Sequence, residues 1–487
     1  MPGRAPADPG ENTPSRYNAA PMKALMVLLL SVAPFLASPA EGADPTETAA
    51  AALLERALDS NGAWNVAQHL TDRIGPRFAG SANAERAVEW TAETLRSWGF
   101  DVRLQPVTVP RWVRGEERAS LVAPADQRLA LTALGGSVAT PPDGLTAPLI
   151  EVRSYDQLRA LGDAVRGKIV FYNRRMDPEL VASGRAFQAY GQVVEFRSTG
   201  AVEAAKLGAV AAVIRSVASH SLRTPHTGSM RYDEAVPKIP AAALATEDAD
   251  LIERLLARGD DVRMHLLLTP ERLPDVESAN VIVEIAGREK PEEIVVIGGH
   301  LDSWDLGTGA IDNASGVAMT METMRLLRTL KLEPRRTIRA VLFMNEEFGL
   351  SGGRKYAEEH PAESHFAAVE ADAGSGEPRG FVTTLEGAAL ERLRPRLALL
   401  APLGANGLAS SPSTGADTSP LTRNGVAGFA VAPDNTLYFA YHHSSADTLD
   451  KIDPRHLKQN AAAMAVLTWI LANEEEPLRG AGLGTRD

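Results

Sequence analysis

The sequence predicts an α/β fold in which a mostly parallel sheet is covered by helices on both faces, with a β-rich module inserted into the chain. Beyond residue 279, apolar strand-like runs alternate with segments of helical spacing, which is typical of a parallel sheet with helical crossovers. Between about residues 120 and 272 the chain carries mostly short β-rich runs. Polar residues gather directly after two of the apolar runs, and open α/β sheets bind ligands at the carboxyl ends of their strands. The predicted fold therefore indicates where a functional site should lie.

The first elements are two helices and a strand. Residues 45–58 and 83–98 place apolar side chains at helical spacing, and Gly99 is suited to end the second helix. A Gly- and Pro-rich loop at residues 74–81 separates the two helices. Apolar and polar residues alternate over residues 101–112, which predicts an edge strand.

The insert is predicted to be a separate module, because the composition changes near Arg114 and regular alternation returns at Ala279. None of its apolar runs carries paired carboxylates or residues at metal-ligand spacing. It does contain His220 and His226 in a polar segment. These are either ordinary loop or core histidines or contributors to substrate recognition, and the sequence leaves both interpretations open.

The second part of the main domain is predicted to alternate strands and helices. The expected strands are 280–285, 293–298, 336–343, 366–370 and 428–432, and the expected helices are 315–330, 351–360, 388–400 and 455–473. The predicted boundaries are 1–40 for an upstream extension with a signal peptide, 41–118 for the first part of the main domain, 119–275 for the insert, 276–475 for the second part, and 476–487 for a tail.

Composition excludes several classes of function. A formal charge of -12 argues against general binding to nucleic acids or to anionic membranes. Cysteine is absent, which excludes disulfides, thiolate metal ligands and a cysteine nucleophile. Any metal site must therefore use His, Asp and Glu side chains.

The N-terminal region resembles an export signal. Residues 22–40 have a basic start, a short apolar run and a small-residue cleavage site, so we expect Met22 to be the true start and residues 1–21 to be disordered. The alternative is a buried N-terminal helix. The apolar run is shorter than the ~20 residues that a membrane-spanning helix needs, so we expect a secreted or periplasmic protein with no membrane span.

Candidate metal ligands follow the strands or lie in late loops. They are His300, Asp302, Asp312, Glu346, Glu347, Asp372, His442, His443 and Asp447. Such a set of histidines and carboxylates suits zinc, manganese or cobalt. Two neighbouring divalent ions need a bridging carboxylate and further ligands on each side. Five residues from five segments supply the expected number: His300, Asp312, Glu347, Asp372 and His443.

Glu346 is the spare carboxylate beside a ligand. Adjacent residues at a strand end point in different directions, so Glu347 can bind metal while Glu346 faces the substrate as a general base. The alternative is a solvated Glu-Glu pair on the surface. Asp302 is predicted to orient the His300 ring, and Asp447 either plays a similar role or caps a loop. Spacing alone does not separate His442 from His443.

The combined motifs resemble the cocatalytic dizinc peptidases, the family of bacterial aminopeptidases and glutamate carboxypeptidase. The resemblance spans about residues 64–472 and rests on segments 298–305, 310–313, 345–347, 370–374 and 442–448. Segments 219–221, 225–228 and 236–240 of the insert make the plasma glutamate carboxypeptidase branch, also called carboxypeptidase Q, the nearest. The resemblance implies an α/β/α zinc-peptidase sandwich whose insert is a protease-associated domain.

The resemblance also implies roles for single residues. Asp312 would bridge two zinc ions, with His300 and Asp372 on one ion and Glu347 and His443 on the other. Glu346 would be the general base. A cis peptide is expected after the bridging Asp312, and Asn313 stands where the family often has a second Asp.

The resulting expectation is a secreted dizinc exopeptidase that acts on dipeptides or short peptides and forms a homodimer. The alternatives are a single-zinc acyltransferase similar to glutaminyl cyclase and a metal-free receptor-like binding protein. The direction of attack depends on loops 411–419 and 434–441. Within the first, Asp417 either pairs with a substrate ammonium or caps a turn, and the sequence favours the turn.

Overall fold

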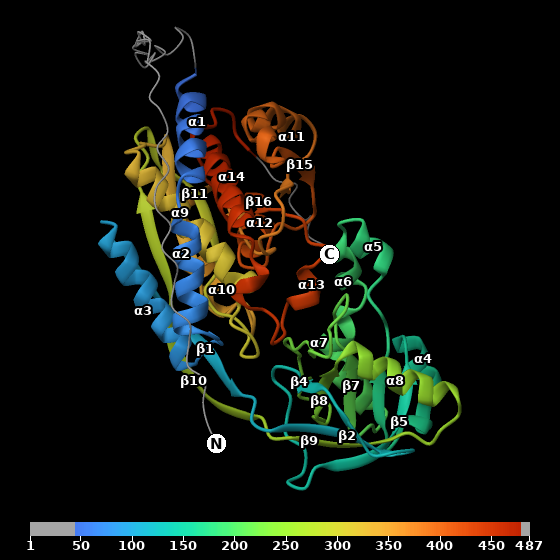
Figure 1. Ribbon diagram of the computed structural model, residues 1–487. Helices are drawn as coiled ribbons and strands as arrows, with labels where there is room; N and C mark the ends of the chain where they lie inside the picture. Colours follow the sequence, from blue (N-terminus) through green and yellow to red (C-terminus); the bar gives the residue numbers. More distant parts are fainter. Residues whose placement is uncertain (1–43, 479–487) are drawn as a thin grey trace, which may run out of the picture. The chain divides into compact units, whose positions relative to one another are not determined.

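The computed structural model describes residues 44–478 (Figure 1). The predicted signal peptide at residues 22–40 and most of the predicted tail lie outside the described residues. No helix between residues 44 and 478 is both long enough and apolar enough to cross a bilayer.

The main sheet has eight strands in the order β1-β10-β12-β11-β13-β16-β14-β15. In that order, they span Arg103–Val113, Glu271–Ile285, Arg336–Phe343, Lys290–His300, Ser364–Glu370, Ala427–Val431, Gly380–Thr383 and Gly407–Ser410. The central strands β12, β11, β13 and β16 are parallel, but β1, β10 and β14 join the sheet by antiparallel pairing. Strand β15 pairs with β14 in parallel, so the sheet is mostly parallel but mixed, as predicted. Which strands run antiparallel was not predicted, because strand direction leaves no trace in local periodicity.

Helices cover both faces of this sheet. Side chains alternate along a strand, so Val295 and Ile297 of β11 join one core while Ile294 and Val296 join the other. The first core is completed by α1 (Pro45–Leu58), α2 (Gly62–Gln68), α3 (Ala82–Ser97), α9 (Ser315–Thr329) and α14 (Pro454–Asn473). The second is covered by α10 (Ser351–Glu359) and α12 (Ser419–Arg423). This is the predicted α/β/α layering.

A second eight-stranded sheet occupies the predicted insert and begins two residues before it, at Glu117, in the order β3-β2-β9-β5-β6-β7-β8-β4. Its strands span, in that order, Gln127–Leu129, Glu117–Ala123, Arg263–Leu268, Leu145–Val152, Ile169–Tyr172, Ala211–Arg215, Ala241–Leu244 and Leu131–Ala133. Its helices are α4 (Tyr155–Leu161), α5 (Pro178–Ala182), α6 (Ala186–Gly191), α7 (Val194–Lys206) and α8 (Thr246–Ala257). The insert contains more helix than predicted, because several of these helices are too short to show a period. Its assignment as a protease-associated domain stays a prediction.

Other departures from the predicted elements have local causes. The helix predicted over 388–400 is instead α11 (Gly387–Leu393) followed by a 3-10 segment, Arg394–Leu403. Pro395 lies two residues past the end of α11 and Pro402 lies later in the segment, and a proline lacks the amide that a continuing α-helix requires. The sequence also did not predict α2, the π-helical turn His69–Ile74 that follows it, or α13 (Tyr438–Tyr441).

Candidate metal centre

The parallel strands at the centre of the main sheet bring the predicted ligands to one edge. Strand β11 ends at His300, which pairs in register with Phe343 at the end of β12. Strand β13 ends at Glu370, two residues before Asp372. The Glu346–Glu347 pair follows β12. Because the strands run in the same direction, the residues that follow them meet at the same edge of the sheet.

Asp312 lies between two groups of predicted ligands. Its Oδ1 is 3.0 Å from His300 Nε2, and its Oδ2 is 3.3 Å from His443 Nε2. On one side, His300 Nε2 is also 3.3 Å from Asp372 Oδ1. On the other, His443 Nε2 is 2.9 Å from Glu347 Oε2. One carboxylate thus contacts both histidines through different oxygens, and each histidine has a second carboxylate of its own.

The geometry favours His443 over His442 as a ligand. His442 Nε2 is 3.6 Å from Asp312 Oδ2 and has no contact with Glu347, whereas His443 reaches both carboxylates. The two rings stack with centroids 3.5 Å apart. His442 also forms a compact group with Asp312 and His443, so the contact with Glu347 is what distinguishes the two histidines.

The Asp447 side chain holds the segment that carries Asp312 through hydrogen bonds to its backbone amides. Asp447 Oδ1 accepts hydrogen bonds from the amides of Ala310 and Ile311, both at 2.8 Å, and Oδ2 accepts one from the Asp312 amide at 3.2 Å. The Asp312–Asn313 peptide is cis. The three amide contacts place the Asp312 side chain between the two histidines.

Asn313 has a structural role. Its Nδ2 donates to the Ala371 carbonyl at 2.7 Å, and its Oδ1 accepts from the Gly316 amide at 2.9 Å. The segment that precedes α9 is thereby tied to the segment that precedes Asp372. The departure from the second Asp of the family thus leaves the predicted ligand set intact.

Asp302 contacts three of the site residues, but in a different way from the prediction. The His300 Nδ1 is 3.0 Å from the main-chain carbonyl of Asp302 and 3.6 Å from its carboxylate. The carboxylate instead accepts hydrogen bonds from the amides of Glu346, at 3.1 Å, and Glu347, at 3.3 Å. Asp302 therefore orients the His300 ring mainly through its backbone and holds the Glu-Glu turn through its side chain.

The charges of the centre depend on these contacts. Although burial opposes ionisation, hydrogen bonds from His300 and His443 hold the pKa of Asp312 well below its usual value. Burial raises the pKa of Glu347 to about 7, and the neighbouring Asp312 adds to the rise. Burial also lowers the pKa of His442 well below its usual value, with a further contribution from His443.

Glu346 differs from its neighbour Glu347 in its exposure. It is half-buried, whereas Glu347 is buried. Burial raises the pKa of Glu346 well above its usual value, and the carboxylates of Asp372 and Glu347 raise it further. A half-buried carboxyl group beside the predicted ligands is placed where a general base is needed.

The side chains of the centre fit metal ions. The buried atoms Glu347 Oε1 and Asp372 Oδ1 accept no hydrogen bond from any residue between 44 and 478. Buried polar atoms normally have a partner, and a cation would supply one. The donor set of two imidazoles and three carboxylates, without a thiolate, is the kind that zinc accepts. His300, Asp312 and Glu347 also form a group compact enough to hold one ion.

The insert contributes to this centre through its backbone. The Thr227 amide donates to the His443 carbonyl at 2.9 Å, and the Thr227 carbonyl lies 3.3 Å from His443 Nδ1. His226 is buried, with neither ring nitrogen hydrogen-bonded within residues 44–478, and His220 is exposed. Both interpretations of these histidines stay open, but the segment next to His226 holds a predicted ligand. Main-chain contacts of this kind leave no signal in the sequence.

The sequence favoured a turn-capping role for Asp417, but its side chain caps no turn within residues 44–478. It is 1% exposed, and neither carboxylate oxygen accepts a hydrogen bond from a residue within 44–478. Glu370 accepts the amides of Ala416, Asp417 and Thr418 instead. The favoured role is therefore wrong, because a buried acid 47 residues away supplies the cap. Pairing of Asp417 with a substrate ammonium stays a prediction.

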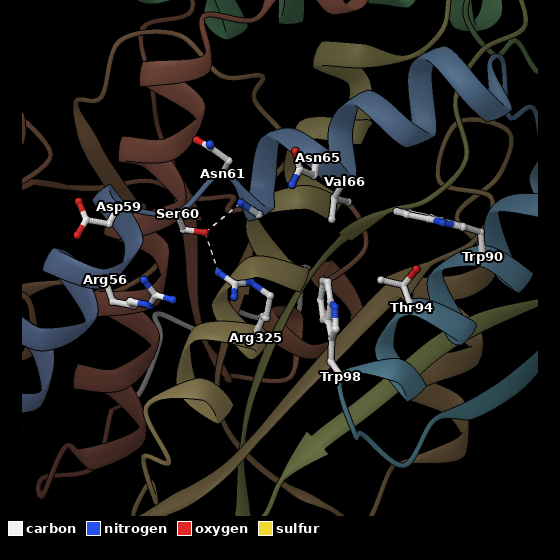
Figure 2. A pocket seen from close by; sticks show the side chains of 11 residues that line it. Arg56, Asp59, Ser60, Asn61, Asn65, Val66, Trp90, Thr94, Trp98 and Arg325 are labelled. Carbon is white, nitrogen blue, oxygen red and sulfur yellow. Dashed lines mark hydrogen bonds between the residues drawn. The ribbon is translucent and has the colours of Figure 1, made fainter.

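A pocket of about 450 Å³ lies elsewhere, next to the loop between α1 and α2 (Figure 2). Trp90 of α3 and Trp98, which directly follows that helix, line one side of it, and Arg325 of α9 lies near Ser60. The Arg325 guanidinium already pairs with Glu322 and donates to Ser60 Oγ at 2.7 Å. None of the predicted metal ligands lines this pocket.

Known proteins share this chain's sequence and fold. Peptidase family M28 matches residues 280–468. Carboxypeptidase Q of Bos taurus is 38% identical over 412 residues, which cover 84% of this chain and 85% of the relative. The crystal structure of a peptidase M28 precursor from Shewanella amazonensis superposes with a TM-score of 0.84 at 41% identity, covering 89% of this chain and 98% of that one. A zinc aminopeptidase from Bacillus subtilis shares the fold, with a TM-score of 0.63 at 21% identity and coverage of 85% and 96%. The chain therefore belongs to peptidase family M28 and is a zinc metallopeptidase that resembles carboxypeptidase Q.

Proposed function

We propose that this protein is a dizinc exopeptidase that hydrolyses dipeptides or short peptides with a free terminus. The observation that carries the proposal is the position of Asp312, which offers one oxygen to the His300 side of the centre and the other to the His443 side. In this assignment His300 and Asp372 would hold one zinc ion, Glu347 and His443 would hold the other, and Asp312 would be shared between them.

The chemistry requires a nucleophile and a proton carrier. Zinc bound at this centre would polarise the scissile carbonyl and lower the pKa of the attacking water. Glu346 takes the proton from that water and delivers it to the leaving amine, so that one carboxyl group acts as base and then as acid. Its half-buried position directly before the predicted ligand Glu347 supports this role.

Two buried acids, Asp447 and Asp302, hold the backbone of the centre in place during the reaction. Asp447 holds the backbone that carries Asp312, and Asp302 holds the turn that carries Glu346 and Glu347. Partners that orient metal ligands contribute to metal affinity as well as to rate.

We propose further that the protein is exported and forms a homodimer. Export rests on the basic, apolar and small-residue pattern of residues 22–40, and the dimer rests on the family resemblance. N-terminal sequencing of the mature protein would locate the cleavage site. Sedimentation analysis would give the number of chains in the assembly.

Two other functions compete with this proposal. A single-zinc acyltransferase needs only one half of the centre, and a receptor-like protein needs neither metal nor base. Retention of all five ligand positions together with Glu346 favours the dizinc peptidase.

The decisive experiment is hydrolysis of unblocked dipeptides by the purified protein, with zinc and after treatment with a chelator. We expect cleavage that requires zinc, with two ions bound to each chain. Dipeptides blocked at the amino or the carboxyl terminus would then establish which free terminus is needed. Two bound ions without cleavage of any dipeptide would argue against this substrate class, and absence of both metal and cleavage would favour the receptor-like alternative.

A further inference from the structure

Arg77 is a fully buried arginine without a carboxylate partner. Its side chain is among the largest in the core, and it takes part in no ion pair within residues 44–478. Its guanidinium nitrogens instead donate to main-chain carbonyl oxygens. These belong to Leu301 at 2.9 Å, Leu70 at 3.4 Å, Gly75 at 3.1 Å, Thr308 at 2.7 Å and Gly309 at 2.9 Å.

Three of these carbonyls belong to segment 301–309, which connects His300 to the turn that carries Asp312. The Arg77 guanidinium donates hydrogen bonds to the first residue of the segment and to its last two. In the middle, Ser303 Oγ accepts the Arg77 amide at 3.0 Å, and the Ser303 amide donates to the Arg77 carbonyl at 3.3 Å. A segment without regular secondary structure is thereby held near its start, at residues 301 and 303, and at its end, at residues 308 and 309.

Only arginine offers this geometry. Its planar fork carries five N–H donors in fixed directions, whereas lysine offers three donors on one rotating ammonium. Burial lowers the pKa of Arg77 to about 10, so the group keeps its charge at neutral pH. The carboxylates of Asp447, Asp302 and Asp312 lie close enough to stabilise that charge. Arg77 therefore also supplies a permanent positive charge beside a strongly acidic centre.

Arg336 is a natural comparison, because it is equally buried but has a different environment. It is the first residue of β12, at the opposite end of that strand from the metal centre. Its guanidinium pairs with Glu293 at 2.5 Å and lies 3.7 Å from the centre of the Phe366 ring. Loss of Arg336 should thus destabilise the core without touching the metal centre.

We propose that Arg77 is a positioning residue of the metal centre: by holding segment 301–309 it keeps His300 and Asp312 in register and so determines how tightly zinc is retained. The inference rests on the proposed dizinc centre. It assigns the Gly- and Pro-rich loop at residues 74–81 a role that neither the motifs nor the strand ends suggested.

The test compares Arg77→Lys, Arg77→Met and Arg336→Met in the zinc-loaded protein. For each variant we would measure the zinc dissociation constant by competition with a chelator, the rate of zinc loss and the thermal unfolding midpoint. We expect the Arg77 variants to bind zinc roughly 10–100-fold more weakly, the range found when partners of metal ligands are removed. Arg77→Lys should fall within this range although it keeps the charge. Arg336→Met should lower the unfolding midpoint and leave zinc affinity at the wild-type value.

If Arg77→Met does not fold, Ser303→Ala still tests the inference, because it removes the contact to the Arg77 amide and otherwise only the local hydrogen bond to the Trp304 carbonyl. It should raise the zinc dissociation constant severalfold. Wild-type zinc affinity in Arg77→Lys and Ser303→Ala would overturn the inference while leaving the proposed function intact. An equal loss of zinc affinity in Arg336→Met would also overturn the inference, since the loss of any buried arginine would then weaken zinc binding. A wild-type protein that binds no zinc would overturn the proposed function itself.

Discussion

Replacement of Asp302 by asparagine tests whether the turn that carries both glutamates must be held by a carboxylate. The two Asp302 oxygens accept the amides of Glu346 and Glu347, at 3.1 and 3.3 Å. Asparagine keeps the volume but offers one acceptor and one N–H donor, so one amide loses its partner. An unpaired buried donor costs about 1–3 kcal/mol. If this loss appears in the transition state, about 1.4–2.7 kcal/mol corresponds to a 10–100-fold fall in kcat/KM.

The assay is dipeptide hydrolysis at saturating zinc, together with zinc content and urea unfolding. Asp177→Asn is the matched control, because Asp177 also accepts two consecutive amides, those of Glu179 at 2.9 Å and Leu180 at 3.2 Å, at the start of α5. Both of these amides bond to the single oxygen Oδ1, which asparagine retains, so Asp177→Asn should keep both hydrogen bonds, its stability and its kcat/KM. The reasoning would be refuted if Asp302→Asn kept kcat/KM within twofold of wild type, or if the control lost as much activity.

Three further predictions follow from the structure. Glu346→Gln should keep its zinc and lose kcat/KM by about a hundredfold or more, because glutamine accepts no proton; near-normal turnover would remove Glu346 from the mechanism. Gly316→Ala should lower the free energy of unfolding by about 1–3 kcal/mol, since a Cβ there would overlap the Ala371 carbonyl, whereas Gly191→Ala, with open space around it, should be neutral or stabilising in the same urea titration. Burial lowers the pKa of His365 to about 4, so below pH 6.5 the unfolded chain binds more protons than the folded chain. The contribution of His365 to the free energy of unfolding should be fully present above pH 6.5 and fall by about 3 kcal/mol toward pH 4. In the same urea titrations, His365→Gln should lose less free energy of unfolding over this interval.

The sequence was informative wherever chemistry and local periodicity coincide. Apolar runs revealed β11, β12 and β13, and the polar residues that follow them were correctly expected at one edge of a sheet. A strand end fixes the position of the residues directly after it, so His300 and the Glu346–Glu347 pair could be placed from the chain alone. The family also followed from these motifs.

Local sequence was less informative about the edges and the irregular parts of the fold. The antiparallel pairing of β1, β10 and β14 depends on contacts between strands that are distant in the chain. The short helices of the insert and the 3-10 segment Arg394–Leu403 depend on packing and on proline positions, so helical spacing alone misjudged them.

Which residue types form the centre was determined by the sequence, but how they are held was decided only by the tertiary structure. The spacing left His442 and His443 equivalent, and distances to Asp312 and Glu347 separate them. Asp302 binds amides 44 and 45 residues away, and Arg77 binds carbonyls 224–232 residues away. These contacts use backbone groups that every residue carries, so no side-chain pattern could reveal them before the chain was folded.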